Sequence, residues 1–301
     1  MHATNTIDAE ADVKARGTSR AVATAEENAA IEVHVELLHK SFSGREVLRG
    51  IDFDVPRGQM LAIVGNSGSG KTVLLEHVIG QLRPDQGRVC LADHESDGAP
   101  LTDLSTLDDN AMDRIRIHWG VVFQRNALLS GSVYENISLP LILVKGLSED
   151  EARQKAREVL EEVGLKPDET LEKKRDELSG GMEKRVAIAR ALAMDPLLLL
   201  YDEPTTALDP EHAKLVQDLI AKTHRAHEKD GGKHTSLIVT HDKDLLYRLR
   251  PRVLMLREGQ VSFDGSYEEF QKRSDSKEIR PYFELMPGLH LRPTARGRNH
   301  R

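Results

Sequence analysis

The chain has 301 residues, and its 42 Lys and Arg against 49 Asp and Glu give a formal net charge of −7. This length allows one large domain or two modest ones, and the acidic balance argues against a protein that coats nucleic acid. The single cysteine, Cys90, cannot form an internal disulfide, which excludes a disulfide-built secreted scaffold. No apolar run approaches the roughly 20 residues of a membrane helix, and no apolar stretch typical of a secretory signal stands at the start.

The first part of the chain changes character at Ile31. Residues 1–30 are rich in Ala, Thr, Glu and Asp, and we expect a disordered arm because they cannot bury enough apolar surface to offset the entropy of ordering. Alternating apolar residues predict strands over 31–37 and 47–55. The unbroken apolar run 60–64 is typical of a strand buried on both faces.

A glycine-rich loop follows this buried strand and precedes helical spacing up to Gly80. Its residues match G-x-x-x-x-G-K-[ST] in full: Gly65, Asn66, Ser67, Gly68, Ser69, Gly70, Lys71 and Thr72. Such a loop turns successive backbone N–H groups toward phosphate oxygens, and the following helix adds the positive end of its dipole. Lys71 supplies charge to the β- and γ-phosphates, and the Thr72 hydroxyl can bind Mg²⁺. The motif predicts that the chain binds a nucleoside triphosphate.

The remaining chain alternates strands with helices. We interpret residues 92–117 as irregular, and expect strands over 120–123, 197–200 and 237–240 and a terminal hairpin over 253–263. Ser148 with Glu151 three residues later predicts a capped helix over 148–163. The alternation predicts an α/β fold with a mostly parallel sheet, an inserted helical subdomain at about 125–190, a domain spanning 31–272 and a basic extension over 273–301.

Polar residues stand where the later strands end. Asp202 and Glu203 follow an apolar strand, and there Asp202 can reach a bound Mg²⁺ while Glu203 polarises a water; the alternative is a solvated acidic loop. His241 and Gln124 each end another strand, at the edge where open α/β sheets bind ligands. A structural or surface role is the alternative for His241.

A second candidate anion cradle is the sequence Ser179-Gly180-Gly181 at the start of a helix. Taken alone, this sequence is more often an ordinary helix-start turn. Its meaning therefore depends on the other motifs.

Six motifs follow one another in the order and spacing of an ATP-binding cassette (ABC) ATPase. They are the phosphate loop, Gln124, the segment 178–182, the pair at 202–203, the segment 206–209 and His241. The chain resembles this family over roughly residues 31–270. The resemblance implies a P-loop NTPase fold with a RecA-like sheet core, an antiparallel β subdomain and a helical subdomain. It also implies ATP and Mg²⁺ as cofactors.

The resemblance assigns a role to each matching residue. Gln124 touches the metal and the membrane partner, Glu203 is the catalytic carboxylate, and His241 contacts the γ-phosphate. Ser179, Gly180 and Gly181 close on ATP held by a second copy, and Asp209 lies across that dimer. Phe42 is placed to stack on adenine, with core packing as the alternative. The nucleotide-binding set further comprises Gly65, Asn66, Ser67, Gly68, Ser69, Gly70, Lys71, Thr72 and Val73, and the metal set comprises Thr72, Gln124 and Asp202.

We call Ser179–Gly181 the signature. Finer details resemble the ATPase subunits of Mla/Mce-type phospholipid transporters, namely Met182 directly after the signature, the helix 71–80 and the segments 127–129, 133–137 and 139–141. This implies a polytopic permease and a lipid-binding Mce-type subunit as partners, no nucleic acid, and a place on the cytoplasmic face of the inner or plasma membrane. The alternatives are the ATPase of a polar-solute importer, such as one for amino acids, and a soluble cassette ATPase. The apolar patch 282–287 could dock on a neighbouring copy or cap its own domain.

Overall fold

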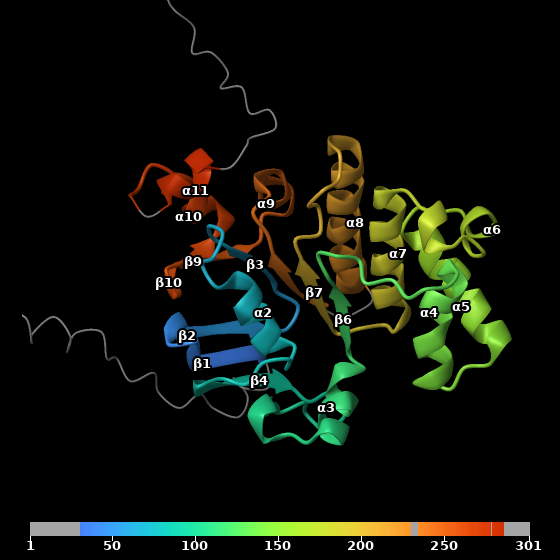
Figure 1. Cartoon of the computed structure of the whole chain (residues 1–301), viewed down its shortest axis with the longest axis horizontal. Coiled ribbons are helices and arrows are strands. Elements are labelled where there is room, and N and C mark those ends of the chain that lie inside the picture. The colour runs from blue at the N-terminus through green and yellow to red at the C-terminus, as the bar shows by residue number, and fades with distance from the viewer. Residues whose placement is uncertain (1–30, 230–233, 278, 286–301) are drawn as a thin grey trace, which may run out of the picture.

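The computed structural model describes residues 31–229, 234–277 and 279–285. The predicted N-terminal arm and the chain beyond residue 285 lie outside these described residues. Within them, two sheets lie at the centre and helices pack around them (Figure 1).

The larger sheet of the described chain has six strands, in the order β10 (Gln260–Ser266), β9 (Arg252–Arg257), β3 (Met60–Val64), β8 (Thr235–Val239), β7 (Leu198–Asp202) and β6 (Trp119–Val122). All neighbours pair in parallel except β10, which is antiparallel to β9. Every residue of β3, β7 and β8 is buried. The predicted mostly parallel core is confirmed, and its parallel strands bring their carboxyl ends to one edge.

The smaller sheet is antiparallel and has the order β2 (Arg45–Pro56), β1 (Ile31–Phe42), β4 (Gln86–Ala92) and β5 (Leu101–Asp103). It lies beside α2 (Lys71–Val78), the helix that follows the phosphate loop (Figure 1). This sheet confirms the antiparallel subdomain that the resemblance implied. Cys90 lies in β4 and is buried.

The prediction that residues 92–117 are irregular is wrong. They contain β5, the 3₁₀ turn η1 (Leu104–Thr106) and α3 (Asp109–Arg116). The Asp108 carboxylate caps α3 by accepting a hydrogen bond from the Ala111 N–H at 2.7 Å. Only Met112 and Ile115 of this helix are buried, so its apolar stripe is too short to stand out in the sequence.

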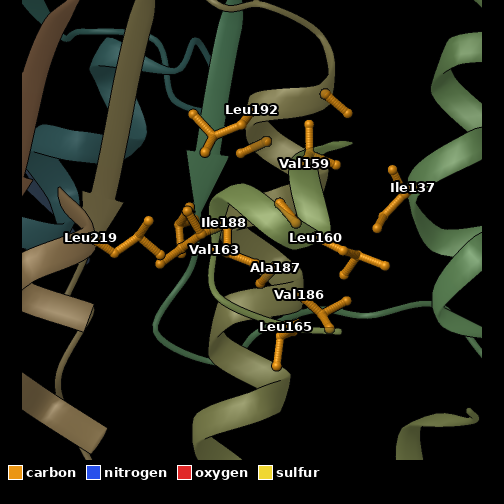
Figure 2. Packing of buried hydrophobic residues seen from close by; sticks show 14 of the residues in the cluster. Ile137, Val159, Leu160, Val163, Leu165, Val186, Ala187, Ile188, Leu192 and Leu219 are labelled. Carbon is orange, nitrogen blue, oxygen red and sulfur yellow. The ribbon is translucent and has the colours of Figure 1, made fainter. Parts of the chain in front are cut away.

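Helices occupy the chain between β6 and β7, namely α4 (Val133–Leu143), α5 (Glu149–Glu162), α6 (Pro167–Thr170), the turn η2 (Arg175–Glu177) and α7 (Gly180–Ala193). The capped helix expected over 148–163 is confirmed as α5, with Ser148 and Glu151 forming its capping box. Side chains of α7 pack between Val159 and Leu160 on one side and Leu219 of α8 (Pro210–Lys229) on the other (Figure 2). Helix α7 is therefore held on one side by α5 and on the other by α8.

The last described helices are α9 (Lys243–Leu249), α10 (Tyr267–Lys272) and α11 (Arg280–Leu285). The Tyr282 ring is fully buried and lies edge-on to Phe270, with 5.6 Å between ring centres. The described part of the apolar patch 282–287 thus packs on its own domain. In the described ranges, no helix combines the length and the apolar character needed to cross a bilayer.

Candidate functional site

The phosphate loop joins β3 to α2, and its backbone requires glycine. Gly65 and Gly70 have φ angles of +149° and +101°, which side chains disfavour. A Cβ at Gly70 would also lie 2.7 Å from Leu48 Cδ2. Lys71 Nζ donates to the carbonyls of Gly65 at 2.8 Å and Asn66 at 3.2 Å, so the lysine fixes the curvature of the loop.

The end of β7 places two carboxylates beside this loop. Asp202 is buried, whereas Glu203 turns out of the strand with a left-handed φ of +47°. Such a conformation costs energy in a residue with a side chain and is typical of functional sites. The Glu203 carboxylate lies 2.7 Å from His241 Nδ1 and accepts a hydrogen bond from the Thr206 hydroxyl at 3.3 Å.

A cavity of about 460 Å³ unites these segments. Its lining comes from the phosphate loop, the ends of three strands and the start of β2: Val47, Gly65, Ser67, Gly68, Gly70, Lys71, Thr72, Val73, Gln124, Glu203 and His241. Residues separated by more than 100 positions in the chain therefore line one cavity, which is the candidate site for a nucleoside triphosphate. Sequence reasoning missed Val47, because an apolar residue near the start of a strand carries no signal of its own.

Burial and charge shift two ionisable groups beside the cavity. Burial lowers the pKa of Lys71, although the nearby carboxylates of Glu203 and Asp202 oppose the shift. Burial and the Glu203 charge raise the pKa of Asp202, although Lys184 and Lys71 oppose that shift. Burial thus makes the charged form of each group less stable than it is in water. An added opposite charge would stabilise that form.

The oxygen donors beside the loop could hold a divalent cation. Asp202 Oδ1 is buried and has no hydrogen-bond partner among the described residues. Thr72 is exposed and lines the cavity together with Gln124. Carboxylate, hydroxyl and amide oxygens are ligands that suit Mg²⁺, so this set fits the predicted metal.

Other predicted residues lie away from this cavity's lining. Ser179 caps α7 by accepting from the Met182 N–H at 3.2 Å. Ser179 and Gly180 are exposed, whereas Gly181 is buried. Asp209 accepts from the His212 N–H at 3.1 Å and lies 2.6 Å from His212 Nδ1. His212 in turn packs against Gly181, where an added Cβ would lie 2.7 Å from its Cγ. The signature and Asp209 are therefore neighbours of each other rather than of their own chain's phosphate loop.

The last three predicted residues have different surroundings. Asn66 and Ser69 line a second hollow on the far side of the phosphate loop. Phe42 ends β1 with 42% of its surface exposed, so core packing does not account for it. Lys40 Nζ lies 5.6 Å from the centre of the Phe42 ring. The stacking of adenine on Phe42 stays a prediction.

Known proteins share this family and fold. A family model described as ABC transporter matches residues 48–206. The chain is 37% identical over 254 residues to the L-cystine transport system ATP-binding protein TcyN of Escherichia coli, covering 84% of this chain and 97% of that protein. It is 36% identical over 245 residues to the TRIGALACTOSYLDIACYLGLYCEROL 3 protein of Arabidopsis thaliana chloroplasts, covering 77% and 68%.

A solved structure matches as well. The ATP-binding cassette MJ0796, seen as a dimer with ADP and phosphate after hydrolysis, aligns with a TM-score of 0.67 at 30% identity, covering 78% of this chain and 98% of that one. The fold and site define a P-loop ATPase of the cassette type. The chain belongs to the ABC transporter family, and it is the ATP-hydrolysing, nucleotide-binding kind of subunit.

Proposed function

We propose that this chain powers a membrane transporter for a small polar solute such as an amino acid, by hydrolysing ATP between two copies of itself. The observation that supports ATP hydrolysis is the cavity lined by Lys71, Gln124, Glu203 and His241. Supporting the solute class are relatives named for the transport of cystine, arginine and histidine. They favour the polar-solute alternative over a phospholipid transporter.

The chemistry follows from the placement of the side chains. Lys71 and the loop N–H groups neutralise and orient the phosphates. Thr72, Gln124 and Asp202 would hold Mg²⁺, which supplies charge stabilisation for phosphoryl transfer. Glu203 orients and polarises the attacking water, and its contact with His241 holds that ring toward the γ-phosphate.

The exposed signature supports a site shared by two copies. Ser179 and Gly180 are exposed, and neither they nor Asp209 lines the cavity of their own chain. A second copy can present these groups to the nucleotide, as a helix start suited to anions. The similar cassette MJ0796 was solved as a dimer. Loss of the γ-phosphate would then release the pair, and this is the movement that a transporter can use.

A partner has to carry the solute, because the candidate site is built for nucleotide. We propose a polytopic permease that holds the chain at the cytoplasmic face of the inner or plasma membrane. Exposed Leu139, Leu143 and Val144 on and after α4 give the helical insert an apolar surface that suits such a contact.

A lipid transporter is the second candidate. One specific observation favours it, since the chloroplast relative carries the name of a glycolipid. The motif resemblance to Mla/Mce-type ATPases points the same way. The Mce-type subunit itself has no support among the relatives described above.

Affinity purification from native membranes in mild detergent tests these proposals, with the untagged strain as control. A permease with a polar-solute-binding subunit and no enriched lipid supports the first candidate. A permease with a single-span subunit and bound phospholipid supports the second. Recovery of the chain without any membrane protein contradicts both.

A further inference from the structure

The signature helix α7 carries a buried lysine that reaches the segment containing Gln124. Lys184 is only 2% exposed, although it bears a charge. Its Nζ donates to the carbonyl of Phe123 at 3.2 Å and to that of Gln124 at 3.0 Å. Burying an ammonium group is costly unless it is hydrogen-bonded, so these two carbonyls are the partners that make its position tenable.

A second cation on the same helix holds the next part of that segment. Arg190 Nη1 donates to the Ala127 carbonyl at 2.9 Å, and its Nη2 donates to the Asn126 carbonyl at 3.4 Å. Ala127 has a left-handed φ of +48°, a conformation that persists only where the surroundings enforce it. Lys184 and Arg190, which we call the α7 clamp, therefore grip four carbonyls between residues 123 and 127.

The four hydrogen bonds of the clamp go to backbone carbonyls of this segment. Gln124 lines the nucleotide cavity while its main chain is held by α7. At its other end, α7 starts at the signature, with Ser179 as its cap. Apolar side chains in the middle of α7 pack closely with their neighbours (Figure 2). This packed helix thus connects the main chain of Gln124 to Ser179–Gly181.

We infer that Lys184 and Arg190 are positioning residues that make Gln124 and the signature move as one body. This inference rests on the proposed roles of Gln124 and of Ser179–Gly181. Without the clamp, segment 123–127 could shift while α7 stayed in place. Gln124 would then lose its alignment with the cavity although the phosphate loop remained intact.

A spectroscopic experiment tests the clamp independently of catalysis. A nitroxide is attached to the full chain at the exposed position 125 through Arg125→Cys, with Cys90→Ala as background. In Lys184→Met and in Arg190→Met the label should become more mobile, and its central line should narrow. Lys155→Met is the matched control, because Lys155 pairs with Asp195 at 2.7 Å and leaves segment 123–127 untouched. Equal line shapes in all four proteins would overturn the inference.

Kinetics test the coupling to Gln124. Lys184→Met should lower kcat by roughly tenfold while KM for ATP changes by less than about twofold, since misplacing a group costs rate rather than phosphate binding. Lys184→Arg, which keeps a donor, should recover part of the rate. Combining Lys184→Met with Gln124→Ala should cost no more than Gln124→Ala alone. Losses that multiply would overturn the inference.

The two failures can be told apart. If Gln124→Ala leaves kcat unchanged, the proposed role of Gln124 is wrong, and the nitroxide line shape still decides whether the clamp exists. If Lys184→Met does not fold, Arg190→Met and the conservative Arg190→Lys carry the same comparison. A clamp that acts only on stability would lower the melting temperature of the variants and leave the rate of the folded protein unchanged. This result would overturn the positioning role.

Discussion

Single residues at the site combine burial with charge. Lys71 holds the phosphate loop through two carbonyls while burial disfavours its charge. Asp202 is buried with one oxygen unpartnered among the described residues. A triphosphate with its cation would add an opposite charge beside each group, which explains why this edge is suited to that ligand.

Lys71→Ala tests this account of the loop. We expect ATP affinity to fall by roughly a hundredfold, because charged hydrogen bonds contribute up to about 3 kcal/mol. Equilibrium binding of a fluorescent ATP analogue measures the loss. Lys222→Ala on α8 is the control, since Lys222 donates to the Glu162 carbonyl at 3.4 Å and does not line the nucleotide cavity. Tight binding by Lys71→Ala would refute the assignment of the loop.

Cys90 gives a prediction about pH. Burial raises the pKa of its thiol from 9.0 to about 11, so the folded protein keeps the proton while the unfolded chain loses it. Stability should therefore fall as the pH rises from about 9 to about 11. Denaturant midpoints across that window should drift down in the parent protein and less in Cys90→Ala. The folded thiol should also resist iodoacetamide at pH 8, and rapid labelling there would contradict its burial.

At the scale of elements, the patterns that the sequence reveals are those that burial makes regular. The strand Met60–Val64 is buried along its whole length, and α5 is preceded by Ser148, whose spacing to Glu151 is visible directly. Helix α3 escaped prediction because a single turn of apolar contact is indistinguishable from a loop. The clamp escaped as well, because nothing local marks Lys184 as buried; its burial depends on where segment 123–127 lies.

Gly181 links two elements and gives a prediction at this scale. A methyl group there would collide with the His212 ring at the start of α8, and moving that ring would break its contact with Asp209. Gly181→Ala should cost about 1–3 kcal/mol of unfolding free energy, as overpacking does. Combining it with His212→Ala should restore most of that loss. If Gly181→Ala alone unfolds like the parent protein, the close approach of α7 and α8 is wrong.

For the whole molecule, the sequence predicts the ATPase activity better than the transported solute. Phosphate and metal chemistry dictates residue types, so Lys71, Asp202, Glu203 and His241 could be proposed from motif and strand position, and three of them line one cavity. The solute leaves no comparable trace, which agrees with our proposal that the cavity takes the nucleotide while a partner carries the solute. The phospholipid interpretation therefore rested on resemblance alone, and relatives named for amino-acid transport favour the alternative.

The central claim is that two copies enclose ATP and that Glu203 then drives its hydrolysis. Glu203→Gln keeps the shape of the side chain but removes the charge that polarises water. The most direct measurement is the molar mass of this variant by light scattering, with Mg²⁺–ATP and with Mg²⁺–ADP. Its rate of phosphate release is measured beside that of Glu161→Gln, a control at an exposed position. The account predicts a stable dimer with ATP only, and a rate reduced by about a hundredfold or more. A monomer with both nucleotides, turning over ATP at the parental rate, would contradict it.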